Sequence, residues 1–466
     1  MLRAFLSHTD AQIGRLMGFL DEIGELEDTV VILVSDNGAS AEGGPQGSIN
    51  DVRLTNLDPA GTSEMFRRID EIGGPTTHNN YPWGWTMAGN TPFKRWKREV
   101  HEGGVADPCI VSWPGRFSGC AGQVRHQFAH AVDVLPTVLE LAGMEAPSEI
   151  EQVQQSRIDG VSFAYLLDPG GAETTGRHLT QHFEMFGSRA VYHDGWKAVT
   201  FHPVGPIYGD GLEPNARFED DVWELYHVAE DVSETDDVAS QHPERLGRMI
   251  DLWWEEARQN DVLPLDNRVL WTLVHPKPDH RRPRDVFRYF AGGAQVPETV
   301  AVNVRNRSHS IHVEVVIPDG VIAQGVLIAL GSVLGGWSLF ALEGSLHYVH
   351  NLYGKERHLI STEETLESGS HDLGFVFEKD DGPGGKGALS IDGRIVTEAV
   401  IPQFTPAGFN GVGAGLTCGY EWGPAIGTGY EAPFPFNGTI TKALVEVTGP
   451  VVRDPLAELA AILSEQ

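Results

Sequence analysis

The chain has 466 residues, of which 41% are hydrophobic and 21% charged, a composition typical of globular proteins and a length that predicts two or three domains. Its formal net charge of −31 argues against general affinity for nucleic acid or for anionic membranes, because the summed field repels polyanions. An anionic substrate would therefore need a local cluster of basic side chains.

The cysteines, Cys109, Cys120 and Cys418, are not spaced as metal ligands, so neither a disulfide framework nor a zinc site is indicated. The first residues contain no continuous apolar core before a small-residue cleavage site, and the longest apolar run, near 321–330, is too short to cross a bilayer. We therefore expect a chain that is neither exported nor anchored, with the cytoplasm as its default location.

Residues 1 to about 26 carry apolar side chains at intervals of three and four, which predicts an amphipathic helix. The run 29–35 follows, and its residues from Val30 to Ser35 are apolar or small and mostly β-branched. Such a run is typical of a strand that is buried on both faces and belongs to a parallel sheet.

This strand is followed directly by Asp36-Asn37-Gly38. In open α/β sheets, ligands bind beyond the carboxyl ends of the strands. A carboxylate and an amide supply hard oxygen donors, which suit Ca²⁺ or Mg²⁺ better than zinc. A simple turn after a strand is the alternative interpretation.

Residues 39–92 form an irregular stretch that includes Tyr81-Pro82-Trp83-Gly84-Trp85, whose rings either wall a pocket or pack the loop down. A basic cluster comes next and precedes Gly103-Gly104; it consists of Lys94, Arg95, Lys97 and Arg98. In an otherwise acidic molecule this cluster predicts an anion site, and a solvated charged loop is the alternative.

A strand at 109–113 and a helix at 124–143 give the pattern of the latter portion of an α/β domain, which we place at 1–180. A small α+β subdomain over 181–265 is predicted from hairpin strands near 190–192 and 196–200, a strand at 223–226 and a helix from about 243 to 260.

The composition changes after Pro264. A proline-rich and basic segment predicts an extended linker over 266–290. Short alternating runs with glycine-rich turns then predict an antiparallel β-sandwich over 291–450. Residues 451–466 are expected to form a tail with a short helix.

Several motifs follow one another over about residues 1–265: Ser35-Asp36-Asn37-Gly38, the Lys-Arg-Trp-Lys stretch, Glu102-Gly103-Gly104, Val111-Ser112-Trp113-Pro114, Asp133-Val134-Leu135-Pro136-Thr137, Gly160-Val161-Ser162-Phe163 and Trp223-Glu224-Leu225-Tyr226. In this order they resemble the second half of the sulfatases, members of the alkaline-phosphatase-like superfamily. The aromatic stretch and the appended β-sandwich, which is lectin-like, are similar to the long arylsulfatases of bacteria. The resemblance implies a partial doubly wound α/β sheet of sulfatase type, followed by the α+β subdomain and the antiparallel β-sandwich.

The resemblance also implies roles for individual residues. In sulfatases a calcium ion is held by two Asp from an early strand and by a later Asp-Asn pair, which Asp36 and Asn37 match. A lysine before the Gly-Gly turn contacts the sulfate; Lys97 fits by its distance from that turn, with Lys94 as the second choice. Calcium and the ammonium group would neutralise charge on the sulfuryl oxygens as the ester bond breaks.

The chain departs from the family at its most important point. The sulfatase nucleophile is a formylglycine made within Cys/Ser-x-Pro-Ser-Arg, and the sequence contains no such motif. The two early Asp ligands and the catalytic histidines of the family would lie before Met1. The chain therefore contains half of a calcium site and no catalytic nucleophile.

We expect an arylsulfatase-like sulfuric ester hydrolase whose chain is incomplete and inactive as given. Its substrate would be a small sulfate ester or a sulfated glycan, and a missing N-terminal sulfatase portion would be its partner. A carbohydrate-binding or structural protein with a degenerate sulfatase scaffold is one alternative. A phosphate ester hydrolase of the same superfamily is another, but two-zinc relatives would show His ligands near the strand ends.

Overall fold

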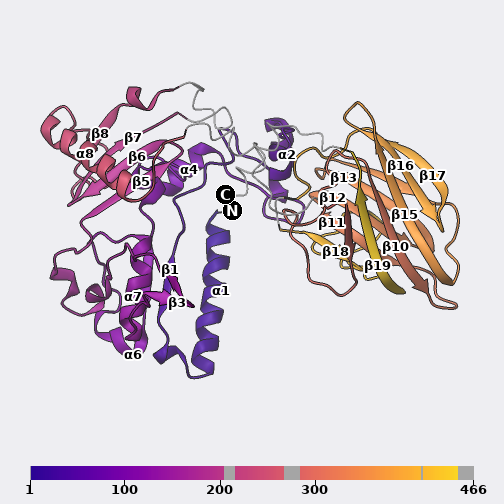
Figure 1. Cartoon of the computed structure of the whole chain (residues 1–466), viewed down its shortest axis with the longest axis horizontal. Coiled ribbons are helices and arrows are strands. Elements are labelled where there is room, and N and C mark those ends of the chain that lie inside the picture. Colours follow the sequence, from indigo (N-terminus) through magenta and orange to yellow (C-terminus); the bar gives the residue numbers. More distant parts are fainter. Residues whose placement is uncertain (1, 204–215, 267–283, 411–412, 450–466) are drawn as a thin grey trace. The chain divides into compact units, whose positions relative to one another are not determined.

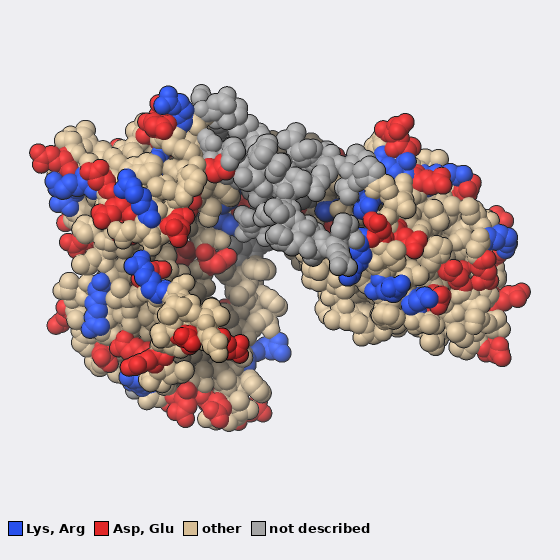
Figure 2. Space-filling view, in the orientation of Figure 1, with Lys and Arg blue, Asp and Glu red and all other residues tan. Residues whose placement is uncertain are grey.

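The computed structural model describes residues 2–203, 216–266, 284–410 and 413–449. The chain divides into two compact units, and each is built from separate stretches of sequence. Unit 1 contains Met1–Ala41 and Gly84–Asn267, and unit 2 contains Glu42–Trp83 and Arg268–Gln466. In Figure 2 acidic side chains are spread over the visible face of both units, in keeping with the net charge of −31.

Unit 1 begins with the predicted long helix and strand. Its first part contains α1 (Leu2–Glu22), β1 (Val31–Val34), α4 (Trp83–Asn90), α5 (Glu102–Val105), β2 (Cys109–Ser112), α6 (Pro114–Phe117), α7 (Val134–Ala142), β3 (Glu149–Ile150) and β4 (Val153–Gln154). Helix α7 ends at Gly143, which adopts a left-handed conformation with φ 67° and so closes the last turn.

The prediction that the first strand is buried in a parallel sheet is wrong. Within the described residues strand β1 pairs only with β2, in antiparallel register from Val31↔Ser112 to Val34↔Cys109. Three of the apolar side chains in this pair remain 41–59% exposed, namely Leu33, Val34 and Ile110. A run of β-branched residues reports strand propensity, but it does not encode the direction of the partner strand or what covers the faces.

The second part of unit 1 is a four-stranded antiparallel meander with one helix packed across it (Figure 1). Its elements are β5 (Thr180–Met185), β6 (Ser188–His193), β7 (Trp196–Thr200), β8 (Trp223–Tyr226) and α8 (Pro243–Gln259). Helix α8 places Met249 and Trp253 against Val191, Ala198 and Leu225 of the sheet, and these side chains form a buried core.

Unit 2 contains two antiparallel sheets, which we call the two-sheet region. The six-stranded sheet has the order β17-β16-β15-β10-β19-β9, and the five-stranded sheet has the order β14-β13-β12-β11-β18. The bounds are β9 (Val286–Tyr289), β10 (His309–Ile317), β11 (Gly325–Ser332), β12 (Gly335–Leu342), β13 (Ser345–Leu352), β14 (Glu356–Ser361), β15 (Gly369–Lys379), β16 (Gly385–Ile391), β17 (Arg394–Ile401), β18 (Leu416–Cys418) and β19 (Thr439–Val447).

Side chains from both sheets contribute to one buried hydrophobic cluster. On β10 the residues alternate strictly between buried and partly exposed positions from His309 to Val315, as a strand with one solvated face should. Strand β9 lies within the stretch for which we expected a linker, whereas most of that stretch and the expected C-terminal helix lie outside the described residues.

Unit 2 also contains α2 (Asp51–Thr55) and α3 (Thr62–Arg67), short helices in the stretch that the sequence predicts to be irregular. Along the part of the chain that the structure describes, no helix combines the length and apolar character needed to cross a membrane.

Candidate functional site

The candidate site is formed by three backbone segments of unit 1. We call them the strand-end segment (residues 35–39), the basic loop (residues 94–98) and the Gly-Gly turn (Gly103-Gly104). The backbone N–H of Gly38 donates to Gly104 O at 3.3 Å, and Ser35 N–H donates to Pro108 O at 3.3 Å. A Cβ on Gly38 would lie 1.8 Å from Gly103 O, so only glycine permits this approach.

The basic loop wraps closely around the Gly-Gly turn. A Cβ on Gly103 would lie 2.3 Å from the carbonyl oxygens of Lys94 and Arg95. The loop contains two arginines in the left-handed region, Arg95 with φ 68° and Arg98 with φ 76°. Such a conformation costs free energy for a residue other than glycine, and it persists only where the surrounding contacts enforce it.

Asn90, the last residue of α4, connects all three segments. Its Oδ1 accepts from Ala39 N–H at 3.2 Å, and its Nδ2 donates to Arg95 O at 2.8 Å and to Gly103 O at 2.6 Å. One amide side chain therefore satisfies backbone groups of the strand-end segment, the basic loop and the Gly-Gly turn. No sequence motif marks Asn90, whose only visible signal is its place before Thr91-Pro92.

The predicted metal ligands lie on the surface side of this arrangement. Asp36 is exposed and Asn37 is half-buried, with the Asn37 Nδ2 donating to Gly38 O at 3.0 Å. The carboxyl of Asp107 has its pKa raised to about 6, first by burial and then by the negative charge of Asp36. The charge of Asp36 thus acts on the Asp107 carboxyl near the end of the strand.

These residues fit calcium in kind but not in number. Calcium is bound by six to eight oxygen ligands. Asp36 and Asn37 supply side-chain oxygens of the appropriate hard type, but fewer than this number. Among the residues that the structure describes, no three His, Cys, Asp or Glu side chains form a group that could hold a metal ion. The described chain by itself does not form a complete calcium site.

The structure distinguishes the two predicted substrate-binding lysines. The backbone N–H of Lys97 donates to Ala39 O at 3.0 Å, which places residue 97 beside the strand-end segment. The Lys94 ammonium instead donates to Tyr226 Oη at 2.7 Å and to Glu224 Oε2 at 3.2 Å. Lys94 is therefore tied to strand β8.

Glu224 is the centre of a hydrogen-bonded group around Lys94. Its Oε2 also accepts from His101 Nε2 at 3.1 Å and from Tyr226 Oη at 2.6 Å. These bonds, that from His101 first, hold the pKa of Glu224 at about 2, so this carboxylate stays ionised. Burial lowers the pKa of His101, and a neutral imidazole can still donate its Nε2–H to the carboxylate.

The residue before the Gly-Gly turn is fixed by a buried ion pair. Lys197 of β7 has a side chain that is only 1% exposed, and its ammonium lies 2.7 Å from Glu102 Oε1 and 3.3 Å from Glu234 Oε1. Glu234 in turn accepts from the Glu102 backbone N–H at 2.8 Å. Lys197 of the meander sheet therefore holds Glu102, the residue directly before the Gly-Gly turn.

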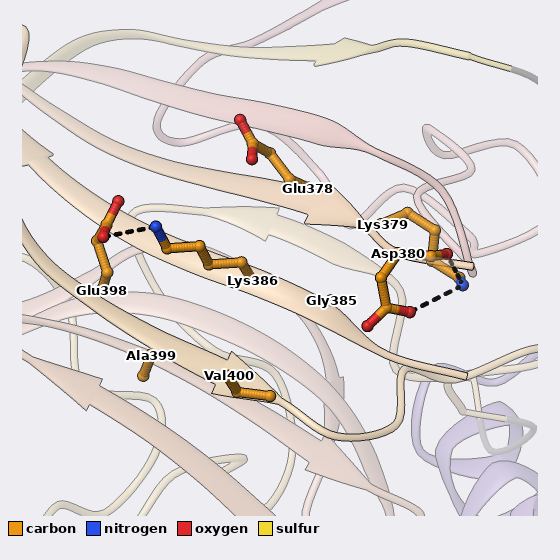
Figure 3. A pocket seen from close by; sticks show the side chains of 8 residues that line it. All are labelled: Glu378, Lys379, Asp380, Gly385, Lys386, Glu398, Ala399 and Val400. Carbon is orange, nitrogen blue, oxygen red and sulfur yellow. Dashed lines mark hydrogen bonds and ion pairs between the residues drawn. The ribbon is translucent and has the colours of Figure 1, made fainter. Parts of the chain in front are cut away.

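A separate cavity of about 490 Å³ lies on the two-sheet region, among β15, β16 and β17 (Figure 3). Its lysines are already engaged: Lys386 lies 2.6 Å from Glu398, and Lys379 donates to Asp380 O at 2.7 Å. Three carboxylates, including Glu378, also line the cavity. This charge pattern does not suit a sulfate group.

Comparison with known proteins relates the first part of the chain to the sulfatases. Residues 4–144 match the family model described as Sulfatase, a range that contains Asp36, Asn37, Lys94 and Lys97. The chain is 26% identical over 254 residues to an uncharacterized sulfatase of Schizosaccharomyces pombe, which covers 54% of this chain and 41% of that protein. It is 29% identical over 197 residues to steryl-sulfatase of Mus musculus, covering 42% and 25% of the two chains.

A third relative is the human N-acetylgalactosamine-6-sulfatase, 25% identical over 234 residues, with 48% of this chain and 36% of the relative covered. Among solved structures, Ps i-CgsB in complex with k-i-k-neocarrahexaose aligns at 19% identity with a TM-score of 0.33, covering 53% and 40% of the two chains. The chain spans less than half the length of each of these relatives. It contains a sulfatase family domain.

Proposed function

We propose that this chain is part of a sulfuric ester hydrolase of the arylsulfatase type. The observation that carries the proposal is the convergence of the strand-end segment and the basic loop on one Gly-Gly turn, within the range that matches the sulfatase family. The strand-end segment carries the oxygen donors Asp36 and Asn37, and the basic loop carries Lys94, Arg95, Lys97 and Arg98. These basic side chains support the proposal, because positive charge attracts an anionic ester.

In this proposal Asp36 and Asn37 are half of a calcium site, and Lys97 binds an oxygen of the sulfate group. A bound calcium ion would supply positive charge that stabilises the sulfuryl oxygens. Lys94 remains the second choice for the sulfate contact. Its ammonium donates to Glu224 and Tyr226, which connects the basic loop to strand β8.

The substrate class follows from the relatives and from the charge of the site. The matched relatives include proteins named for steryl and N-acetylgalactosamine-6-sulfate groups. We therefore propose a small sulfate ester or a sulfated glycan as substrate, and a phosphate ester as the alternative to be tested beside it.

We further propose that the chain as given does not hydrolyse sulfate esters, because its sequence contains no Cys/Ser-x-Pro-Ser-Arg motif that could supply the nucleophile. The exposed apolar side chains of β1 and β2 support the need for a covering segment, since apolar strands are normally buried. An N-terminal sulfatase portion would provide that cover, the nucleophile and the remaining calcium ligands.

Hydrolysis of an aryl sulfate and of the matching aryl phosphate, measured on the chain alone and on a form joined to its encoded upstream sequence, tests this function. We expect turnover of the sulfate only in the joined form. Lys97→Ala and Asp36→Ala should abolish it, whereas Lys94→Ala should retain part of it. Turnover by the chain alone that is lost on Asp36→Ala would overturn the proposed inactivity, and a preference for phosphate would favour the alternative.

A further inference from the structure

Residues 42–83 belong to unit 2, although in sequence they separate the two arms of the candidate site. The chain leaves unit 1 after Ala41, just beyond the strand-end segment, and returns at Gly84, within the helix that carries Asn90. Between these points the chain pairs with itself, through bridges Ser48↔Asn80 and Asn50↔His78. The segments around residues 48–50 and 78–80 therefore lie side by side. We call residues 42–83 the excursion.

The excursion is fixed to the two-sheet region by Asn50, which is 5% exposed and caps α2. Its Oδ1 accepts from Val52 N–H at 3.0 Å, as a helix N-cap does. Its Nδ2 donates to Tyr353 O at 2.7 Å and to Leu334 O at 3.4 Å. The same side chain that begins the helix therefore binds the loops that follow β11 and β13.

Asn56 makes the second attachment, at the other end of α2. Its Oδ1 accepts from the backbone N–H groups of Ala407 and Gly408 at 3.0 and 3.2 Å. Its Nδ2 donates to Gly408 O at 2.8 Å and to Val52 O at 2.7 Å. Because the side chain is only 7% exposed, both the donor and the acceptor depend on these partners.

Apolar packing fills the space between the two asparagines. Val52, which is 1% exposed, forms a buried cluster with Leu334, Leu352 and Tyr353. A Cβ on Gly335 would lie 3.3 Å from Val52 Cγ1 and 2.3 Å from Phe409 O, so glycine is required for this close contact. The loops of the two-sheet region therefore pack closely against α2.

The excursion is also held together internally. Arg53 is buried and its guanidinium lies 2.6 Å from Glu64 Oε1, while its Nε donates to Asp58 O at 2.9 Å. Asp51 accepts from Asn80 Nδ2 at 2.6 Å, which links α2 to the segment around residues 78–80. Anchoring α2 therefore anchors a much larger part of residues 42–83.

We propose that the two-sheet region is a docking platform for residues 42–83. Its loop edge, formed by the loops that contain Leu334, Tyr353 and Gly408, binds this segment of the same chain and not a separate ligand. The docking itself rests on contacts within unit 2. Its functional meaning rests on the proposed sulfatase function: a docked excursion limits the freedom of the chain on both sides, where the strand-end segment and the basic loop lie in sequence.

Hydrogen exchange of the full chain, followed by mass spectrometry, tests this role. The double variant Asn50→Ala/Asn56→Ala should raise the exchange of peptides from residues 42–83 by about tenfold or more, while peptides from β10 and β15 keep their rates. Asn437→Ala is the matched control, because Asn437 also bonds backbone groups of the two-sheet region, Ile322 O at 2.8 Å and Gln324 N at 3.0 Å, but makes none of the bonds that hold residues 42–83.

Asn56→Asp gives a milder test that does not depend on the double variant remaining folded. It keeps the acceptor for Ala407 and Gly408 but loses the donor to Gly408 O and to Val52 O, while Asn50 keeps its own bonds, so a smaller rise in exchange over residues 42–83 is expected. Unchanged protection in both variants would overturn the proposal, as would wild-type exchange of residues 42–83 at the rate of an unstructured peptide.

A glycan that binds the chain and increases exchange over residues 42–83 would also refute it, since the loop edge would then be a ligand site. These measurements need no turnover, so they separate the docking role from the proposed function. Docking that persists in a joined form without sulfatase activity would remove the proposed function and leave the platform intact.

Discussion

Two buried histidines should make the two-sheet region sensitive to acid. His309 and His350 are 2% and 0% exposed, and their rings lie 5.6 and 4.2 Å from the ring of Phe404. Burial lowers the pKa of His309 to about 4 and that of His350 to about 3. A hydrogen bond to the Arg307 carbonyl partly offsets the burial of His309, whereas the neighbouring His358 and His309 lower the pKa of His350 further.

The size of the effect follows from linkage. Each histidine has an ordinary pKa of 6.5 in the unfolded chain and a lower pKa in the folded chain, so below pH 6.5 the unfolded state binds more protons. Stability is therefore complete above about pH 7.5 and falls as the pH decreases toward 4. At pH 5 each histidine should reduce the free energy of unfolding by ~2 kcal/mol, and the pair by ~4 kcal/mol.

Urea unfolding at pH 7.5 and at pH 5 measures this loss. Hydrogen exchange of peptides from β10 and β13 at the same two pH values is the second measurement. The variant His350→Gln should remove about half of the difference between the two pH values. His312→Gln is the control, because His312 lies on the partly exposed face of the same strand as His309. A midpoint that is equal at both pH values, or a full pH dependence in His350→Gln, would refute the reasoning.

Three further changes test unit 1. Asn90→Ala should increase hydrogen exchange in the strand-end segment and the basic loop together, because three hydrogen bonds worth ~1 kcal/mol each are lost; faster exchange in only one of them would argue against a shared anchor. Asp221→Asn should destabilise the meander sheet by ~3–5 kcal/mol in thermal unfolding, because Arg189 is left as a buried charge; a change below ~1 kcal/mol would contradict this. The ionised Glu224 stabilises the folded wild type above about pH 4.5, and this stabilisation is lost as the pH falls toward 2. Glu224→Gln should lack it at every pH, so the free energies of unfolding of the two proteins should converge toward pH 2.

The sequence predicted those elements that have a clear local period. The helix of residues 1–26, three strands of the meander and several strands of the two-sheet region lie where the sequence pattern predicts them. Strand β5 of the meander and several strands of the two-sheet region, β11 among them, were not predicted. All eight residues of β11 are buried, so it lacks the alternation that marks a half-exposed strand. The partner and direction of β1 are likewise set by distant residues.

The candidate site was predictable only where motifs carry chemical signals. Asp36, Asn37 and the lysines stand out by residue type, and the structure places residue 97 beside the strand-end segment. Asn90 was not identified, because an amide that bonds backbone groups up to 51 positions away leaves no pattern in the sequence. The same holds for Asn56, whose partners lie more than 350 positions further along the chain.

The division of unit 2 into two distant stretches has a consequence for biosynthesis. Residues 42–83 leave the ribosome long before Tyr353 and Gly408, the backbone partners of the two anchoring asparagines, have been made. At about 5–20 residues per second, this interval lasts roughly 20–60 s. Throughout that time Val52 and its neighbours have no platform, so residues 42–83 are translated well before they can dock.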